Sequence, residues 1–336
     1  MRSEDKLLAC TKTLTVAFLA VSFIGLWNVF YDGIVEGVIY SMGEYVTPIL
    51  GEQSIGFYDG TDIFGVLAVL VFPLLLSYAA NKKSVCGVVF FLILGCMSMG
   101  AVFVYGTYET VVALAIEFVV FWVLYSNKTV NIGILLLLPI GIFAVMFPYI
   151  AARFDWNEPM EWFISSLPAS FERAPMRTST LESAMAMLVD GNLTGIGVGN
   201  DVFQKVHATY ANVVSSNASD PGSFYIQLIC WSGIGGLITF AVFMLMIFKS
   251  SYGYILVSRD KAIKRKTLAL FTALFVAMIY GAVNCLWNDM RMLFLFWACA
   301  GLLSGFVREG RDREIRLLSG FSENCDRTEL ELRFYK

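Results

Sequence analysis

GSFYIQLICWSGIGGLITFAVFMLMIF, the stretch from residue 222 to residue 248, contains no Asp, Glu, Lys or Arg. A run of about 20 predominantly apolar residues is long enough to cross the hydrocarbon core of a bilayer as an α-helix. Lys249 ends the run and opens a basic segment. The stretch therefore predicts a transmembrane helix that ends at a charged membrane surface.

The rest of the chain has the same character. Its 336 residues are 57% hydrophobic and 15% charged, whereas a soluble domain is closer to half apolar and a quarter charged. The apolar residues form blocks with polar flanks, each a candidate helix. The blocks lie at about 12–30, 62–80, 84–104, 108–126, 130–149, 222–248, 267–287 and 289–306. We therefore expect an all-α integral membrane protein with about eight transmembrane helices.

The basic residues predict the orientation of these helices. An even number of helices places the N-terminus, the C-terminus and every second loop on one side of the membrane. The loops on that side carry nine Lys or Arg, namely Lys82, Lys83, Lys128, Lys249, Arg259, Lys261, Lys264, Arg265 and Lys266, and the two termini add more. Because basic loops stay in the cytoplasm, we expect a multi-pass cell-membrane protein with both termini cytoplasmic. Residues 1–306 would form one membrane domain, and residues 307–336 a charged cytoplasmic tail.

Composition also argues against other classes. The net charge is −3 and the chain has no long basic run, so nothing indicates nucleic-acid binding. The seven cysteines form no CxxC pair and there is a single histidine, so the sequence offers no zinc or haem pattern. We expect neither a metal nor another cofactor.

The largest polar segment, at about 148–221, is predicted to be an extracytoplasmic loop and the place for any chemistry. Residues 179–182 (Ser-Thr-Leu-Glu) match a capping box, which predicts a short helix over 180–190 that Gly191 ends. A glycine-rich turn at 195–199 follows, and then a second helix capped by Asn200 or Asp201. The turn follows no strand, so it is not interpreted as a nucleotide-binding loop.

Several side chains of the loop could bind a substrate or take part in a reaction. Arg173 and Arg177 lie next to the N-terminus of the first predicted helix, where backbone N–H groups and guanidinium groups suit a phosphate. Alternatively, these arginines pair with Glu172 and Glu182 or with lipid headgroups. His207, in the second helix, is a possible base, although an isolated histidine is more often structural.

Glu117 lies inside the predicted fourth span. A carboxylate within the membrane is costly and is a functional-site candidate by default, unless it only bonds to a neighbouring helix. A transporter is therefore conceivable, but matched pairs of Gly- or Pro-broken segments are not evident in the sequence.

Several motifs occur in an order that resembles the O-antigen ligase and O-antigen polymerase family. An Arg-led helix precedes residues 194–199 (Thr-Gly-Ile-Gly-Val-Gly). Residues 223–228 (Ser-Phe-Tyr-Ile-Gln-Leu) then enter a span that contains residues 233–237 (Gly-Ile-Gly-Gly-Leu). Upstream, residues 56–65 resemble the start of one of the family's spans, and residues 287–291 fit related members. The resemblance covers most of residues 55–305.

The resemblance implies a glycosyltransferase that moves a glycan from an undecaprenyl-diphosphate carrier on the outer face of the membrane, without a nucleotide or an obligate metal. Arg177 and Arg173 would hold the diphosphate, because its charge develops as it leaves. Lys205 and Arg153 would support them, and Glu117 is a further candidate for substrate binding. Asp220 or His207 would accept the proton of the acceptor hydroxyl. The partners would be the lipid-linked glycan, membrane lipid and other glycan-assembly membrane proteins.

Departures from the family pattern leave alternatives open. Gly222 and Ser223 stand where the family has His-Asn, and the part of the chain before the first family motif is short. A non-catalytic membrane partner of a glycan-assembly complex is therefore one alternative. Another is a cell-wall glycosyltransferase of the shape, elongation, division and sporulation family, which has a comparable architecture.

Overall fold

The computed structural model describes residues 5–23, 54–55, 58–59, 61–81, 108–126, 174–191, 193–210, 220–258 and 260–319, with a few positions between 86 and 98. These residues are helical except for connecting turns and a two-stranded antiparallel ladder of β1 (Ser54–Ile55) and β2 (Tyr58–Asp59). After the N-terminal helix Asp5–Phe23, the helices are α2 (Thr61–Asn81), α4 (Tyr108–Ser126), α7 (Ala174–Asp190), α8 (Asn200–His207), α9 (Phe224–Val257), α10 (Lys261–Tyr280) and α11 (Met290–Ser319).

Within the described residues, three helices are long and apolar enough to cross a membrane: Asp5–Phe23, Phe224–Val257 and Met290–Ile315. Phe64–Ala80 is a shorter apolar helix. Apart from the short ladder, the described residues thus form an all-helical structure with three helices that could cross a membrane, as the sequence predicts. The predicted span at 84–104 is described only in part, and the one at 130–149 lies outside the described residues.

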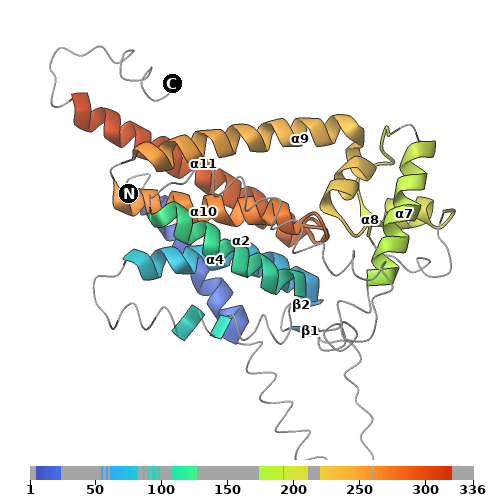
Figure 1. Ribbon diagram of the computed structural model, residues 1–336, viewed down its shortest axis with the longest axis horizontal. Helices are drawn as coiled ribbons and strands as arrows, with labels where there is room; N and C mark the ends of the chain where they lie inside the picture. Colours follow the sequence, from blue (N-terminus) through green and yellow to red (C-terminus); the bar gives the residue numbers. More distant parts are fainter. Residues whose placement is uncertain are drawn as a thin grey trace, which may run out of the picture.

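Helices α2, α4 and α10 pack side by side in the centre of the bundle (Figure 1). Contacts at both ends of the three helices show their directions relative to one another. At one end the hydroxyl groups of Thr110 on α4 and Tyr280 on α10 are hydrogen-bonded at 3.1 Å. Gly65 on α2 fits against both hydroxyls, because a Cβ there would lie 2.5 Å from Thr110 Oγ1. At the other end Arg265 of α10 donates to the Ala80 carbonyl of α2 (2.7 Å) and to the Tyr125 hydroxyl of α4 (3.3 Å). Helices α2 and α4 are therefore parallel, and α10 is antiparallel to both.

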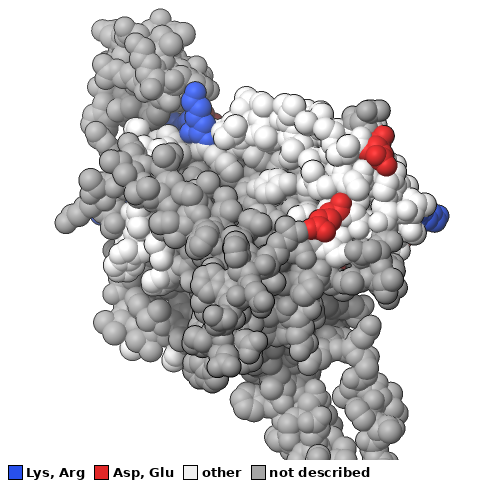
Figure 2. Space-filling model, turned by 45° about the vertical axis from the view of Figure 1, so that its right-hand side comes forward, with Lys and Arg blue, Asp and Glu red and all other residues white. Residues whose placement is uncertain are grey.

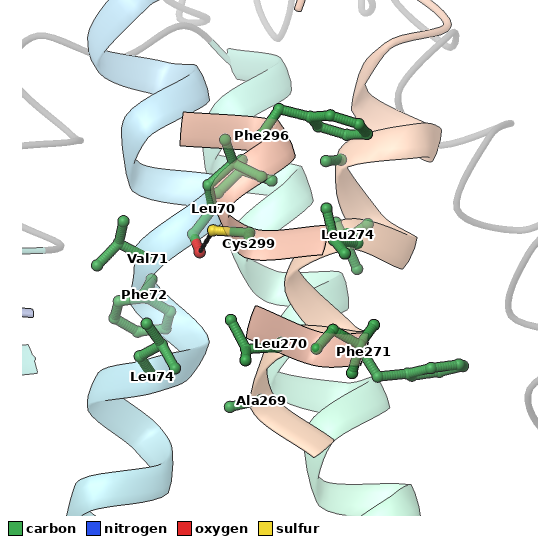
Figure 3. Close-up of a cluster of buried hydrophobic side chains, with 14 of the residues drawn as sticks. Leu70, Val71, Phe72, Leu74, Ala269, Leu270, Phe271, Leu274, Phe296 and Cys299 are labelled. Carbon is green, nitrogen blue, oxygen red and sulfur yellow. Dashed lines mark hydrogen bonds between the residues drawn. The ribbon is translucent and has the colours of Figure 1, made fainter. Parts of the chain in front are cut away.

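Helix α10 forms the middle of the apolar core. Its residues 266–274 are all buried, so no side of this segment faces out of the bundle. Leu70 and Leu74 of α2 and Phe296 of α11 belong to the same buried cluster (Figure 3). On α11, Cys299 lies with its sulfur 4.0 Å from the Leu70 carbonyl. A helix that is apolar on all sides is stable only when surrounded by other helices, which explains the position of α10.

Helix α9 presents an apolar face outward. The side chains of Ile234, Ile238, Val242, Leu245 and Met246 are 48–67% exposed in the chain, and their spacing places them on one side of the helix. The described surface of the face in Figure 2 is mostly uncharged, with isolated acidic and basic side chains. Such an apolar helix face suits contact with lipid.

The helices differ from the predicted spans mainly at their charged ends. Helix α10 was expected at 267–287 but begins at Lys261, where the Asp260 side chain accepts from the Ala262 amide and caps it. Helix α11 was expected to leave the membrane at 306 but continues to Ser319, across the predicted boundary with the tail. Lys, Arg and Glu are good helix formers, so a helix need not end where its apolar segment ends.

Candidate functional site

A break in α9 lies beside the glycine-rich loop. Gly233 has φ 71° and ψ −176°, which interrupts the helix. Around the break, the Ile196 amide donates to the Cys230 carbonyl (2.7 Å), and the Ile234 amide donates to the Leu193 carbonyl (3.1 Å). Loop and helix therefore exchange backbone hydrogen bonds at the point where the helix cannot form its own.

Glycine is required on both sides of this contact. A Cβ on Gly195 would lie 2.6 Å from the Gly233 nitrogen, and a Cβ on Gly233 would lie 2.7 Å from the Thr194 oxygen. Both residues also have positive φ, 85° and 71°, which residues with a side chain rarely adopt. The break and the loop therefore depend on each other.

A small apolar cluster fixes α7 and α8 to the first segment of α9. Ala184, Met187 and Leu188 recur at helical spacing on the buried side of α7. They form one cluster with Phe203 of α8 and Cys230 of α9. In Figure 1 the first segment of α9 turns away from the long segment towards α7 and α8. This arrangement ties the segment that carries the predicted site to a membrane helix.

The first helix of the loop begins earlier than predicted. It starts at Ala174, not at 180, so the predicted capping box is wrong: Ser179 lies inside the helix, where its carbonyl accepts from the Ser183 hydroxyl (2.9 Å). Pro175 explains the early start, since proline is favoured in the first turn of a helix. Its predicted end is confirmed, because α7 ends at Asp190 and the Gly191 amide donates to the Met187 carbonyl.

Of the two predicted phosphate-binding arginines, Arg177 lies at this early start. Arg177 falls in the first turn of α7, where amide groups lack intrahelical partners. Nothing is described of its side chain. Arg173 directly precedes the helix and, like Arg153, lies outside the described residues. Arg177 thus occupies the helix end that the phosphate hypothesis requires.

Helix α8 places its two candidate residues on different sides. Its N-cap is Gly199, without a side-chain cap, so the predicted caps Asn200 and Asp201 already lie in the helix. Lys205 is exposed. His207 is 1% exposed, with its ring stacked on Phe203 at 4.8 Å. This placement favours the structural alternative for His207.

The electrostatic environment of His207 agrees with its buried position. No described residue bonds to its Nε2 atom, and burial lowers the pKa of the imidazole. A neutral imidazole can accept a proton, but this one is buried and therefore closed to an acceptor substrate.

Asp220 lies at the entry to α9. Its Oδ1 atom accepts from the Gly222 amide (2.8 Å) and from the Cys285 thiol (3.3 Å). Its Oδ2 atom accepts from the Asn288 side-chain amide (2.8 Å). The carboxylate thus joins the start of α9 to the connection between α10 and α11.

Trp287, in the same connection, forms an aromatic centre that sequence reasoning did not single out. Its ring centroid lies 4.8 Å from that of Phe224, 5.6 Å from Phe240, 5.8 Å from Phe296 and 5.7 Å from Trp297. These rings come from α9 and α11, so Trp287 packs against both helices. Its neighbour in the sequence, Asn288, bonds to Asp220. The only sequence signal was its place next to Asn288 in a family-like motif.

Glu117, the remaining predicted residue, lies elsewhere. It is completely buried on α4 in the centre of the bundle. The described contacts thus unite α7, α8 and the break of α9, with Asp220 at the entry to α9 and Glu117 in a separate place. Among the described residues, no group of three or more His, Cys, Asp or Glu is arranged to hold a metal.

Comparison of the chain with protein-family models, with curated proteins and with solved structures found no match.

Proposed function

We propose that this protein is a membrane glycosyltransferase that resembles O-antigen polymerases and ligases and transfers a glycan from an undecaprenyl-diphosphate carrier on the outer face of the membrane. The observation that carries the proposal is the contact between residues 193–196 and the break of α9. Two motifs that resemble the family, at 194–199 and 233–237, lie far apart in the sequence but meet through backbone hydrogen bonds. A shared site is a physical reason for both glycine-rich motifs to occur in one chain.

The directions of the helices support the proposed topology of about eight spans with a large outer loop at about 148–221. In that topology the second, fourth, sixth and eighth spans run inward, and the first and seventh run outward. The parallel α2 and α4 and the antiparallel α10 agree with it. The N-terminal helix also agrees, since Thr11 bonds to Tyr78 near the inner end of α2 (3.1 Å) and Phe18 stacks on Phe64 near its outer start (6.4 Å).

In the proposed mechanism, Arg177 binds the diphosphate at the N-terminus of α7. The helix end adds backbone N–H donors, and the guanidinium group offsets the charge that develops on the leaving group. Arg173, Lys205 and Arg153 supply further positive charge around it. Because α7 is packed against α9, the diphosphate would be held close to the membrane helix that anchors the loop.

Asp220 is the better placed of the two candidate proton acceptors. It lies at the entry to α9, whereas His207 is buried on α8.

Arg177 provides the decisive experiment. Arg177→Ala and Arg177→Lys should both lower transfer by about a hundredfold, because lysine keeps the charge but loses the planar two-pronged donor geometry. The measurement is glycan chain length on gels from cells with matched protein levels. Normal glycan in both variants would contradict the proposed role.

A non-catalytic partner of a glycan-assembly complex is the second candidate function. It is favoured by the state of both candidate bases, since His207 is enclosed and Asp220 holds three donors. Deletion of the gene separates the two proposals. Complete loss of polymer together with activity of the purified chain on a lipid-linked donor supports the enzyme. Assembly defects without such activity support the partner.

A further inference from the structure

Glu117 is the most unusual polar residue in the described bundle. It is 0% exposed, and neither of its carboxylate oxygens has a hydrogen-bond partner among the described residues. It lies on the buried side of α4 together with Ala113, Leu114, Val120 and Phe121. The sequence therefore directs a carboxyl group into an apolar interface.

The position of Glu117 along the bundle follows from the contacts at its two ends. Glu117 lies seven residues after Thr110, which bonds to Tyr280, and eight residues before Tyr125, which bonds to Arg265. With a rise of about 1.5 Å per residue, it is about 11 Å from either polar contact along the axis. Glu117 is therefore halfway along the interface of α4 with α10.

Two other polar oxygen atoms lie at the same position along the axis of the bundle as Glu117. Midway between Tyr280 and Arg265, α10 carries Thr272, which is buried and whose hydroxyl has no described partner. On α2, the residue at this position along the axis is Pro73, which lies inside the helix. Proline has no N–H, so the carbonyl of Val69 loses its intrahelical donor there. A carboxyl group, a hydroxyl group and a backbone carbonyl thus share one level of the bundle.

No described side chain at this level can balance a negative charge on Glu117. Between residues 66 and 76 of α2 and between 267 and 279 of α10 there is no titratable residue. The nearest titratable groups on these helices lie towards the ends: Tyr78 on α2, and Lys266 and Tyr280 on α10. On α4 itself they are Glu109 and Tyr125. An ionised carboxylate without a partner in an apolar interior is very costly, and such a group takes up a proton instead.

We propose that Glu117 is a proton-binding site in the centre of the helix bundle, where its neutral carboxyl group is accompanied by the Thr272 hydroxyl and the Val69 carbonyl. These three groups are too few to surround a hard metal cation, which uses about six oxygen ligands. A carboxylate, by contrast, needs only one proton to become neutral. The proposal does not depend on the glycosyltransferase function. It concerns a different part of the molecule from the outer loop.

Two measurements on the purified full-length chain in phospholipid nanodiscs test the proposal. Infrared difference spectra between wild type and Glu117→Gln should contain the C=O stretching band of a protonated carboxyl group at about pH 6. This band should shrink at alkaline pH as the proton leaves. Glu109→Gln is the matched control on the same helix, and the Glu117 band should remain in that variant.

The second measurement is reaction with dicyclohexylcarbodiimide, an apolar reagent. A protonated carboxyl group adds to the carbodiimide and rearranges to an N-acylurea without loss of atoms, which mass spectrometry localises to one residue. We expect labelling at Glu117, reduced at alkaline pH, unchanged by Glu109→Gln and abolished by Glu117→Gln. Labelling there at acidic pH supports the proposal. If the infrared difference band is missing at every pH, the proposal is wrong whatever the reagent shows.

Discussion

Gly195 and Gly233 illustrate how two backbones can meet only where neither carries a side chain. Each would place a Cβ within 2.7 Å of the other segment. Each also has a backbone conformation that costs a non-glycine residue about 1–2 kcal/mol. A single methyl group at either position should therefore force the loop away from the helix break.

We predict that Gly195→Ala loosens the loop, whereas Gly235→Ala does not. Gly235 lies two residues beyond the break, with nothing within 4 Å of its added Cβ, and alanine favours a helix. Limited proteolysis within residues 191–199 of the purified protein measures the difference. Equal cleavage of Gly195→Ala and wild type would show that the loop does not depend on this contact.

His207 should make the outer segment sensitive to acid. Burial lowers the pKa of His207 in the folded protein, while the unfolded chain keeps a value of about 6.5. Below that pH the unfolded state binds a proton that the folded state does not, so the free energy of unfolding of this segment falls as the pH falls. Neutral and alkaline pH leave it unaffected.

Replacing the ring tests this prediction. His207→Phe keeps an aromatic ring against Phe203 but cannot titrate, so proteolysis within residues 191–210 should lose its dependence on pH between about 5.5 and 7.5. The chain has a single histidine, which makes the comparison simple. An unchanged pH dependence in His207→Phe would assign the effect to other groups.

Where the structure describes the predicted spans at 62–80, 108–126, 222–248, 267–287 and 289–306, helices are present, but most of their ends differ from the prediction. The block at 222–248 predicted α9, but the helix continues to Val257 and is broken at Gly233. The break could not be predicted from local sequence, since glycine is common inside membrane helices. It depends on hydrogen bonds to residues 193–196, which lie about 40 positions earlier.

The α10–α11 connection should depend strongly on Trp287. Trp287 is partly buried against the core, and replacing a fully buried tryptophan by alanine costs about 3–5 kcal/mol. Trp287→Ala should therefore lower the free energy of unfolding by less than that amount and loosen the contact of α11 with α9, while Trp287→Phe should retain most of the packing. Thermal unfolding in detergent with tryptophan fluorescence measures both variants. A Trp287→Ala protein as stable as wild type would show that the neighbouring rings pack without it.

The candidate site was predicted less completely than the helices. The glycine-rich motif could be inferred from a local pattern, whereas the predicted helix start at 180 placed Arg177 before a helix that in fact begins at Ala174. The burial of His207 and the three donors to Asp220 could not, because Cys285 and Asn288 come from a connection more than 60 residues later. The aromatic centre at Trp287 likewise joins residues from two helices and the connection between α10 and α11.

The arrangement of the whole chain across the membrane can be tested by labelling. We predict that a cysteine introduced by Asn212→Cys reacts with an impermeant thiol reagent on intact cells, whereas the native Cys325 reacts only after lysis. The unequal distribution of Lys and Arg is the physical reason. Reaction of Cys325 from outside would contradict the proposed orientation.

The contact between the loop and the broken helix also has a consequence for biosynthesis. Chains emerge from the ribosome N-terminus first, so residues 193–196 are made before Gly233. Until Cys230 and Ile234 arrive, the backbone groups of Leu193 and Ile196 have no partners at this contact. The outer segment can therefore complete its fold only when α9 has been inserted, which makes a nascent chain that stops before residue 234 susceptible to proteases.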